Sequence, residues 1–123
     1  MCKKMMNRNI STILIIDDPD NNEQALLLSL QRLGYLVVAA DSPEEGLNMI
    51  AEISPDLIFL GLDSREYYWP RLLTEIGVAP FHPPVIVFAE DPSPDDIRQS
   101  FQMGVFDCLI LPISMNENLQ DTV

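Results

Sequence analysis

The sequence predicts an α/β protein built on a five-stranded parallel sheet, and two features of the chain support this prediction. Five short apolar segments recur along the 123 residues, and each is continuously apolar, as in strands that are buried on both faces. Helical patterns separate them, and strict alternation of strand and helix indicates a right-handed, doubly wound sheet. The simplest arrangement is the flavodoxin-like strand order 2-1-3-4-5. The expected strands lie at 13–16, 36–40, 57–62, 85–88 and 108–111.

The helices between these strands have recognisable ends. The first, at 21–33, places Leu26, Leu30 and Leu33 on one face and stops before Gly34, a suitable residue for a helix C-terminus. A serine three residues before an acid marks the later helix starts. The serine can accept a hydrogen bond from an unpaired backbone N–H, and the acid can stabilise the same helix end. These starts are expected at Ser42, Ser93 and Ser114, with one further, less regular helix at 70–76.

Composition limits what the chain can do. Its 47% hydrophobic content is enough for one core, and we expect a single domain at 11–123 after a lead-in at 1–10, with a truncated last helix. Seven basic and 19 acidic residues give a net charge of -12, which repels nucleic acid and anionic membranes. Cys2 and Cys108 lack metal-site spacing, and no apolar run approaches the roughly 20 residues of a membrane span. A cytoplasmic protein is expected.

The expected crevice holds half of an acidic site. In the predicted order, strands one and three are neighbours where the strand order reverses, so a ligand crevice should lie beyond their carboxyl ends. The first strand runs into the adjacent carboxylates Asp17 and Asp18, whereas the matching point of the third carries Gly61, which has no side chain.

Several stretches, in this order and at this spacing, resemble the receiver domain of bacterial two-component response regulators over residues 11–115. They lie at 13–18, 33–35, 54–58, 83–87 and 103–107, followed by Pro112. The resemblance implies an aspartate at the end of strand three that accepts a phosphoryl group, and an acidic pair on strand one that holds Mg²⁺. It also implies a hydroxyl ending strand four and a lysine ending strand five, which hold the phosphoryl group.

The chain departs from this pattern at every position except the acidic pair. By the resemblance, Asp17 and Asp18 match the pair, the nucleophile position is Gly61, the hydroxyl position is Ala89 and the lysine position is Leu111. No lysine follows Lys4. Cys108 replaces the aromatic switch residue of strand five, and Pro112 remains at the position whose preceding peptide bond is commonly cis in the family. The chain therefore resembles a degenerate receiver, a pseudo-receiver.

The acidic pair and Asp63 leave alternatives open. Without a third carboxylate, Mg²⁺ would keep most of its waters, so Asp17 and Asp18 should bind it weakly at best. Helix capping by Asp18 or Asp20 is the simpler role. Asp63 stands two residues beyond Gly61, on the same side of an extended strand, and is the candidate for a displaced phosphoacceptor. An exposed turn acid is its simpler role.

The resulting prediction is a non-enzymatic interaction module of bacterial signal transduction. The resemblance implies a protein partner or self-association through the face made by the fourth helix, the fifth strand and the fifth helix. A conventional phosphoacceptor receiver using Asp63 is one alternative. A flavodoxin-like cofactor-binding domain is another, although the acidic loop at 17–22 should repel a phosphate. Near the crevice, the aromatic stretch at 67–69 anchors either an interface or the third helix. His82 has no ligand-spaced neighbour.

Overall fold

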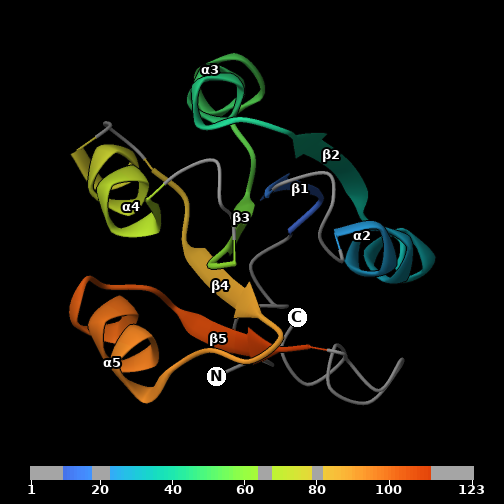
Figure 1. Cartoon of the computed structure of the whole chain (residues 1–123). Coiled ribbons are helices and arrows are strands. Elements are labelled where there is room, and N and C mark those ends of the chain that lie inside the picture. Colours follow the sequence, from blue (N-terminus) through green and yellow to red (C-terminus); the bar gives the residue numbers. More distant parts are fainter. Residues whose placement is uncertain (1–9, 18–22, 64–67, 79–81, 112–123) are drawn as a thin grey trace.

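The computed structural model describes residues 10–17, 23–63, 68–78 and 82–111. These residues form five strands that alternate strictly with helices (Figure 1). In chain order the elements are β1 (Thr12–Ile16), α2 (Glu23–Arg32), β2 (Leu36–Ala40), α3 (Pro43–Ile53), β3 (Leu57–Gly61), α4 (Trp69–Val78), β4 (Val85–Ala89), α5 (Pro94–Gln102) and β5 (Asp107–Ile110).

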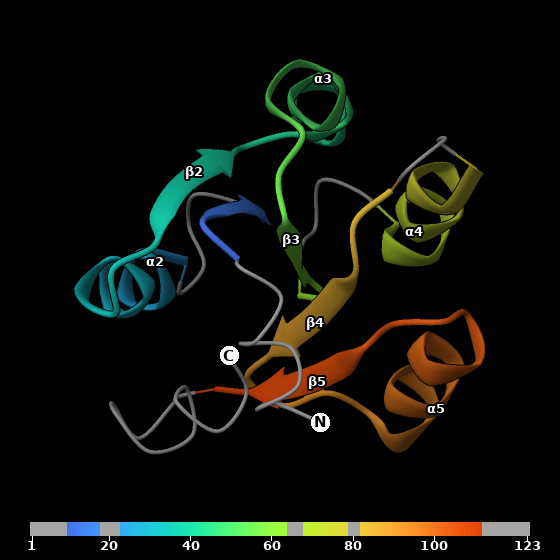
Figure 2. The same ribbon diagram turned by 180° about the vertical axis from the view of Figure 1, so that it is seen from behind.

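The strands form one parallel sheet in the order β2-β1-β3-β4-β5. This confirms the predicted flavodoxin-like class and strand order. Helix α2 covers one face of the sheet, and α3, α4 and α5 cover the other, as the two opposite views show (Figures 1 and 2). Because all strands run in the same direction, their carboxyl ends meet at a single edge, where β1, β3 and β4 lie side by side.

The core lies in two layers, one on each face of the sheet. Within β1, Ile13 and Ile15 pack toward α2, whereas Leu14 and Ile16 pack toward the other helices, since successive side chains of a strand point to opposite faces. All four are fully buried. This two-sided burial explains why the inner strands β1, β3 and β4 are continuously apolar. The edge strands are partly exposed, since Leu36 of β2 is 65% exposed and Ile110 of β5 is 52% exposed.

The helix ends follow the serine and glycine signals. The hydroxyl of Ser42 accepts a hydrogen bond from the Glu45 N–H at 3.1 Å, and that of Ser93 accepts one from the Asp96 N–H at 3.0 Å. Gly34 has a φ of 99°, in the left-handed region that favours glycine. The expected start at Ser114 falls outside the residues that the structure describes.

One helix-face prediction was wrong. Leu26 and Leu30 are fully buried against the sheet, as expected, but Leu33 is 38% exposed. The helix α2 ends at Arg32, so Leu33 lies in the turn beyond it and leaves the buried face. None of the described helices is both long and apolar enough to cross a membrane.

Candidate functional site

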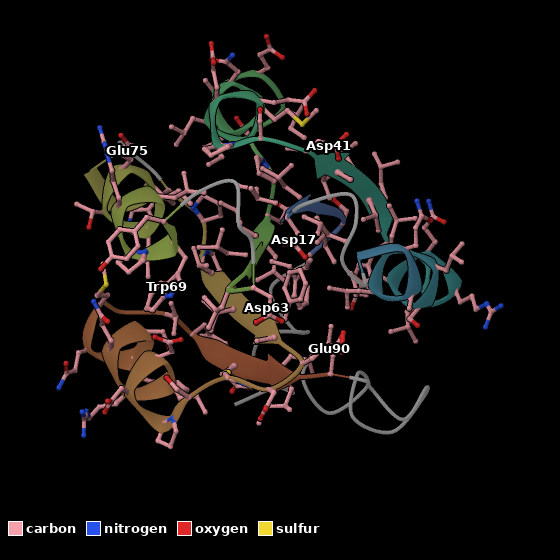
Figure 3. The ribbon with its side chains drawn as sticks, in the orientation of Figure 1. Asp17, Asp41, Asp63, Trp69, Glu75 and Glu90 are labelled. Atoms are coloured by element: carbon pink, nitrogen blue, oxygen red, sulfur yellow. The ribbon has the colours of Figure 1, made fainter. Side chains whose placement is uncertain are left out.

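Asp17 lies at the carboxyl edge of the sheet, directly after β1. Its backbone N–H donates to the carbonyl oxygen of Ala40 at 3.3 Å, which extends the β1–β2 ladder by one residue. Its side chain is only 1% exposed, although the residue is an aspartate. Figure 3 shows it among the strand ends, with Asp63 and Glu90 nearby. Asp18, the other member of the predicted pair, is not among the described residues.

The Asp17 carboxylate lies against the backbone of Gly61, the last residue of β3. An ideal Cβ built on Gly61 would stand 2.8 Å from Asp17 Oδ2 and closer still to Cγ and Oδ1. Real Cβ atoms do not approach other atoms this closely. The predicted nucleophile position therefore lacks a side chain, and the space for one is filled by the carboxylate of Asp17, which follows the neighbouring strand β1.

Asp63, the candidate displaced acceptor, lies just beyond the same strand end and is exposed. One of its carboxylate oxygens, Oδ2, accepts a hydrogen bond from the backbone N–H of Glu90 at 2.9 Å. Glu90 directly follows β4, so this bond joins the ends of β3 and β4. Sequence reasoning did not single out Glu90, because a backbone donor leaves no mark on residue type.

Apolar residues fill the hydroxyl and lysine positions. Ala89 ends β4 and is 1% exposed, and Leu111 follows β5 and is 6% exposed. The backbone N–H of Leu111 donates to the carbonyl oxygen of Ala89 at 2.7 Å, so the two positions are neighbours. Leu111 packs with the core layer on the α2 face. These two side chains offer no hydrogen-bond donor to an anion at this edge.

Cys108, at the switch position of β5, is half-buried against the core layer of α3, α4 and α5. Burial raises the pKa of its thiol, and the nearby negative charge of Asp107 raises it further. A thiol with a raised pKa is a poor nucleophile at neutral pH. Its neighbour in the predicted site, Pro112, is beyond the last described residue, so the cis peptide bond stays a prediction.

The aromatic stretch near the crevice divides into two roles. Trp69 begins α4 and is 6% exposed, packed into the core layer of the α3, α4 and α5 face. Tyr68 is 69% exposed. Packing therefore accounts for Trp69, and an interface role for the exposed Tyr68 stays a prediction; Tyr67 lies outside the described residues. His82 is exposed, and its Nδ1 lies 3.2 Å from the carbonyl oxygen of Pro83.

The described residues do not fit a Mg²⁺ ion at this edge. Mg²⁺ needs oxygen ligands in a nearly octahedral arrangement, with room for several waters. The Asp17 carboxylate is almost completely buried, and it occupies the place from which a third acid at 61 would reach the ion. Across the described part of the chain, no three His, Cys, Asp or Glu residues come together as metal ligands. Weak binding by the Asp17 and Asp18 pair stays a prediction.

The chain is a doubly wound α/β domain with a buried acid at the carboxyl edge of its parallel sheet. The family model described as the response regulator receiver domain matches residues 13–123. The chain therefore belongs to the response regulator receiver domain family. The identification agrees with the resemblance seen in the sequence.

Individual relatives point the same way. The chain is 33% identical over 109 residues to the transcriptional regulatory protein GlrR of Escherichia coli (strain K12), covering 88% of this chain and 24% of that protein. It is 31% identical over 114 residues to protein-glutamate methylesterase/protein-glutamine glutaminase 1 of Myxococcus xanthus (strain DK1622), covering 88% of this chain and 32% of the relative. The chain thus spans about a quarter to a third of these relatives.

Solved structures are similar over nearly the whole chain. A response regulator receiver domain protein from Clostridium thermocellum has a TM-score of 0.77 at 26% identity, covering 90% of this chain and 89% of that chain. The chemotaxis protein CheY4 of Vibrio cholerae has a TM-score of 0.81 at 18% identity, covering 93% and 99% respectively. The second similarity shows the fold alone.

Proposed function

We propose that this chain is a receiver domain that does not take up a phosphoryl group and that acts as a protein-interaction module in the cytoplasm. The observation that carries the proposal is the Asp17 carboxylate in the space beside Gly61. Acyl phosphate formation needs a carboxylate nucleophile with room for an incoming phosphoryl group, and cationic groups that offset its charge. Gly61, Ala89 and Leu111 provide none of these.

Intact-mass spectrometry tests the proposal. The protein is incubated with acetyl phosphate and Mg²⁺, and its mass is expected to stay unchanged. A stoichiometric gain of one phosphoryl group that hydroxylamine removes would contradict the proposal.

The second candidate is a conventional receiver with a displaced acceptor, and one observation keeps it open. Asp63 is exposed at the end of β3, two residues from the nucleophile position. Its hydrogen bond from the Glu90 N–H favours the structural role, because the bond holds one carboxylate oxygen at the end of β4. If a phosphoryl group is gained, its loss in the Asp63→Asn variant would assign the acceptor to Asp63.

The proposed contact surface includes α5 and β5, the fourth helix and fifth strand of the chain. Phe101 on α5 is 46% exposed and Ile110 on β5 is 52% exposed. Large apolar side chains are favourable anchors at protein interfaces. The expected fifth helix of the predicted face falls outside the described residues and stays a prediction. Because Ala89 and Cys108 replace the usual hydroxyl and aromatic switch residues, association through this surface should be constitutive.

Association can be measured with matched charge reversals. Arg98 on α5 forms an exposed ion pair with Asp95, and Arg71 on α4 forms one with Glu75 outside the proposed surface. Arg98→Glu should weaken self-association in sedimentation velocity, or partner capture in a pull-down, whereas Arg71→Glu should not. Gln102→Arg should also weaken it. Beryllofluoride should change none of these results, and association that requires beryllofluoride would contradict the constitutive surface.

A further inference from the structure

Gly61 is a glycine at a position where the backbone does not require one. The described glycines with a positive φ are Gly34 and Gly104, at 99° and 97°. Gly61 instead continues the regular ladder of β3, opposite Phe88 of β4. Glycine inside a strand is unfavourable relative to alanine, and it often marks the close approach of another group. Glycine at 61 is therefore explained by the lack of room for a side chain and not by the backbone conformation.

The group that approaches is the carboxylate of Asp17. All three atoms nearest to an ideal Cβ at 61 belong to this one side chain, with Oδ2 at 2.8 Å. Asp17 is 1% exposed and follows a strand whose last residues are fully buried. An aspartate side chain has only two rotatable bonds, so it cannot move far without leaving the interior. A side chain at 61 would displace it or distort the strand ends.

We propose that Asp17 and Gly61 form an internal lock, in which the carboxylate of strand β1 occupies the place of the side chain that β3 lacks. The lock holds the carboxyl edge in one packed arrangement and leaves no room for a ligand at 61. The lock links the missing acceptor at 61 to the burial of Asp17. Its role in signalling rests on the proposed function. The coupling between the two residues is measured without any phosphoryl donor.

A double-mutant cycle separates the lock from an ordinary strand glycine. In an ordinary strand, Gly61→Ala would leave Tm unchanged or raise it. With the lock, the added methyl group overpacks the site, and Tm should fall by roughly 5–20 °C. In the Asp17→Ala background the space is open, so the same change at 61 should no longer lower Tm. Gly77→Ala is the control, since an ideal Cβ at Gly77 meets nothing within 4 Å.

Additive effects of the two substitutions, or a Gly61→Ala variant as stable as the native protein, would overturn the lock. If a variant does not fold, the native protein still tests it. Nuclear Overhauser contacts are expected between the β protons of Asp17 and the α protons of Gly61, and their absence would overturn the proposal as well. Uptake of a phosphoryl group by the native protein would instead refute the proposed function while leaving the coupling intact.

Discussion

The carboxylate of Asp63 accepts a hydrogen bond from the backbone N–H of Glu90 at 2.9 Å, and this bond joins the ends of β3 and β4. It follows directly on a ladder bond from the Leu62 N–H to the Phe88 carbonyl oxygen, also at 2.9 Å. The two bonds extend the pairing of β3 and β4 past the last residues of both strands. The Asp63 carboxylate thus replaces a backbone carbonyl as the hydrogen-bond acceptor at the carboxyl edge of the sheet, where the site lies.

Removing this acceptor should loosen the edge. Asp63→Ala removes the hydrogen bond between the Glu90 N–H and the carboxylate at 63. We expect the free energy of unfolding to fall by about 1 kcal/mol. Urea denaturation measures the loss. Asp91→Ala changes an exposed acid in the loop that follows β4 and should alter the midpoint much less. Equal effects of the two substitutions would show that the hydrogen bond contributes nothing specific.

Gly46 of α3 packs against Ile16 of β1, so it should not tolerate alanine. Alanine normally stabilises a helix interior by up to about 1 kcal/mol relative to glycine. An ideal Cβ at Gly46 would stand 2.7 Å from Cδ1 of the fully buried Ile16. We expect Gly46→Ala to lower the free energy of unfolding by about 1–3 kcal/mol.

Gly77→Ala in α4 provides the comparison, because nothing lies within 4 Å of its ideal Cβ. It should leave stability unchanged or raise it slightly. If packing decides the outcome, chemical denaturation should show a lower free energy of unfolding for Gly46→Ala and an unchanged or slightly higher one for Gly77→Ala. A stabilised Gly46→Ala variant would show that Ile16 has room to adjust.

Trp69 and Tyr68 should differ sharply when each is truncated. Trp69 is 6% exposed in the core layer of the α3, α4 and α5 face, so Trp69→Ala should cost about 3–5 kcal/mol of folding free energy. Tyr68 is 69% exposed, and Tyr68→Ala should change stability by less than about 0.5 kcal/mol. Thermal denaturation compares the two. A large loss for Tyr68→Ala would mean that its ring packs on the protein.

The sequence predicts the fold and the strand-end positions well, because both depend on local patterns. Continuous apolar segments mark two-sided burial, and Ser42 and Ser93 cap helices through bonds to residues three positions on. Contacts between strands are different. The approach of Asp17 to Gly61 depends on the register of β1 against β3 and on one side-chain torsion, neither of which the sequence states.

Residue type also left some roles undecided. The sequence favoured a turn acid for Asp63 and left a displaced phosphoacceptor as the alternative, but it could not identify the partner, because that partner is a backbone N–H. The aromatic stretch could not be divided into a buried Trp69 and an exposed Tyr68, because helix α4 begins one residue earlier than its expected start. Leu33 was assigned to the buried face because the expected helix extended to residue 33, whereas α2 ends one residue earlier, at Arg32.

Asp56 should make the stability of the fold depend on acid pH. Its Oδ2 accepts hydrogen bonds from the backbone N–H groups of Thr12 and Ser11, each at 3.0 Å, and from the Ser11 hydroxyl at 3.1 Å. These bonds, the Thr12 bond first, lower the pKa of the Asp56 carboxyl below its usual value. They favour the charged form and tie the start of β3 to the start of β1.

A lowered folded pKa means that the folded state binds fewer protons than the unfolded state. The contribution of Asp56 is therefore fully present above its unfolded pKa of about 3.9 and is lost as the pH falls through the folded pKa. Asp56→Asn should lower Tm at pH 7, and the difference from the native protein should shrink below about pH 4. Asp91→Asn, at an exposed acid in the loop after β4, is the matched control. If the Tm difference between the native protein and Asp56→Asn stays constant as the pH falls, the charge-based explanation is contradicted.

Restoring an aspartate at 61 should not restore phosphorylation. In the Gly61→Asp variant the new carboxylate competes with Asp17 for the same space, and two carboxylates there repel each other. The Asp17→Ala/Gly61→Asp variant relieves that conflict, but Ala89 and Leu111 still offer no donor, and no lysine follows Lys4. Intact mass after incubation with acetyl phosphate and Mg²⁺, on samples shown to be folded by circular dichroism, should stay unchanged for both variants. A phosphoryl gain in the single variant Gly61→Asp would show that the site lacks only its nucleophile. A gain confined to the double variant would show that Asp17 blocks phosphorylation and that the missing lysine does not.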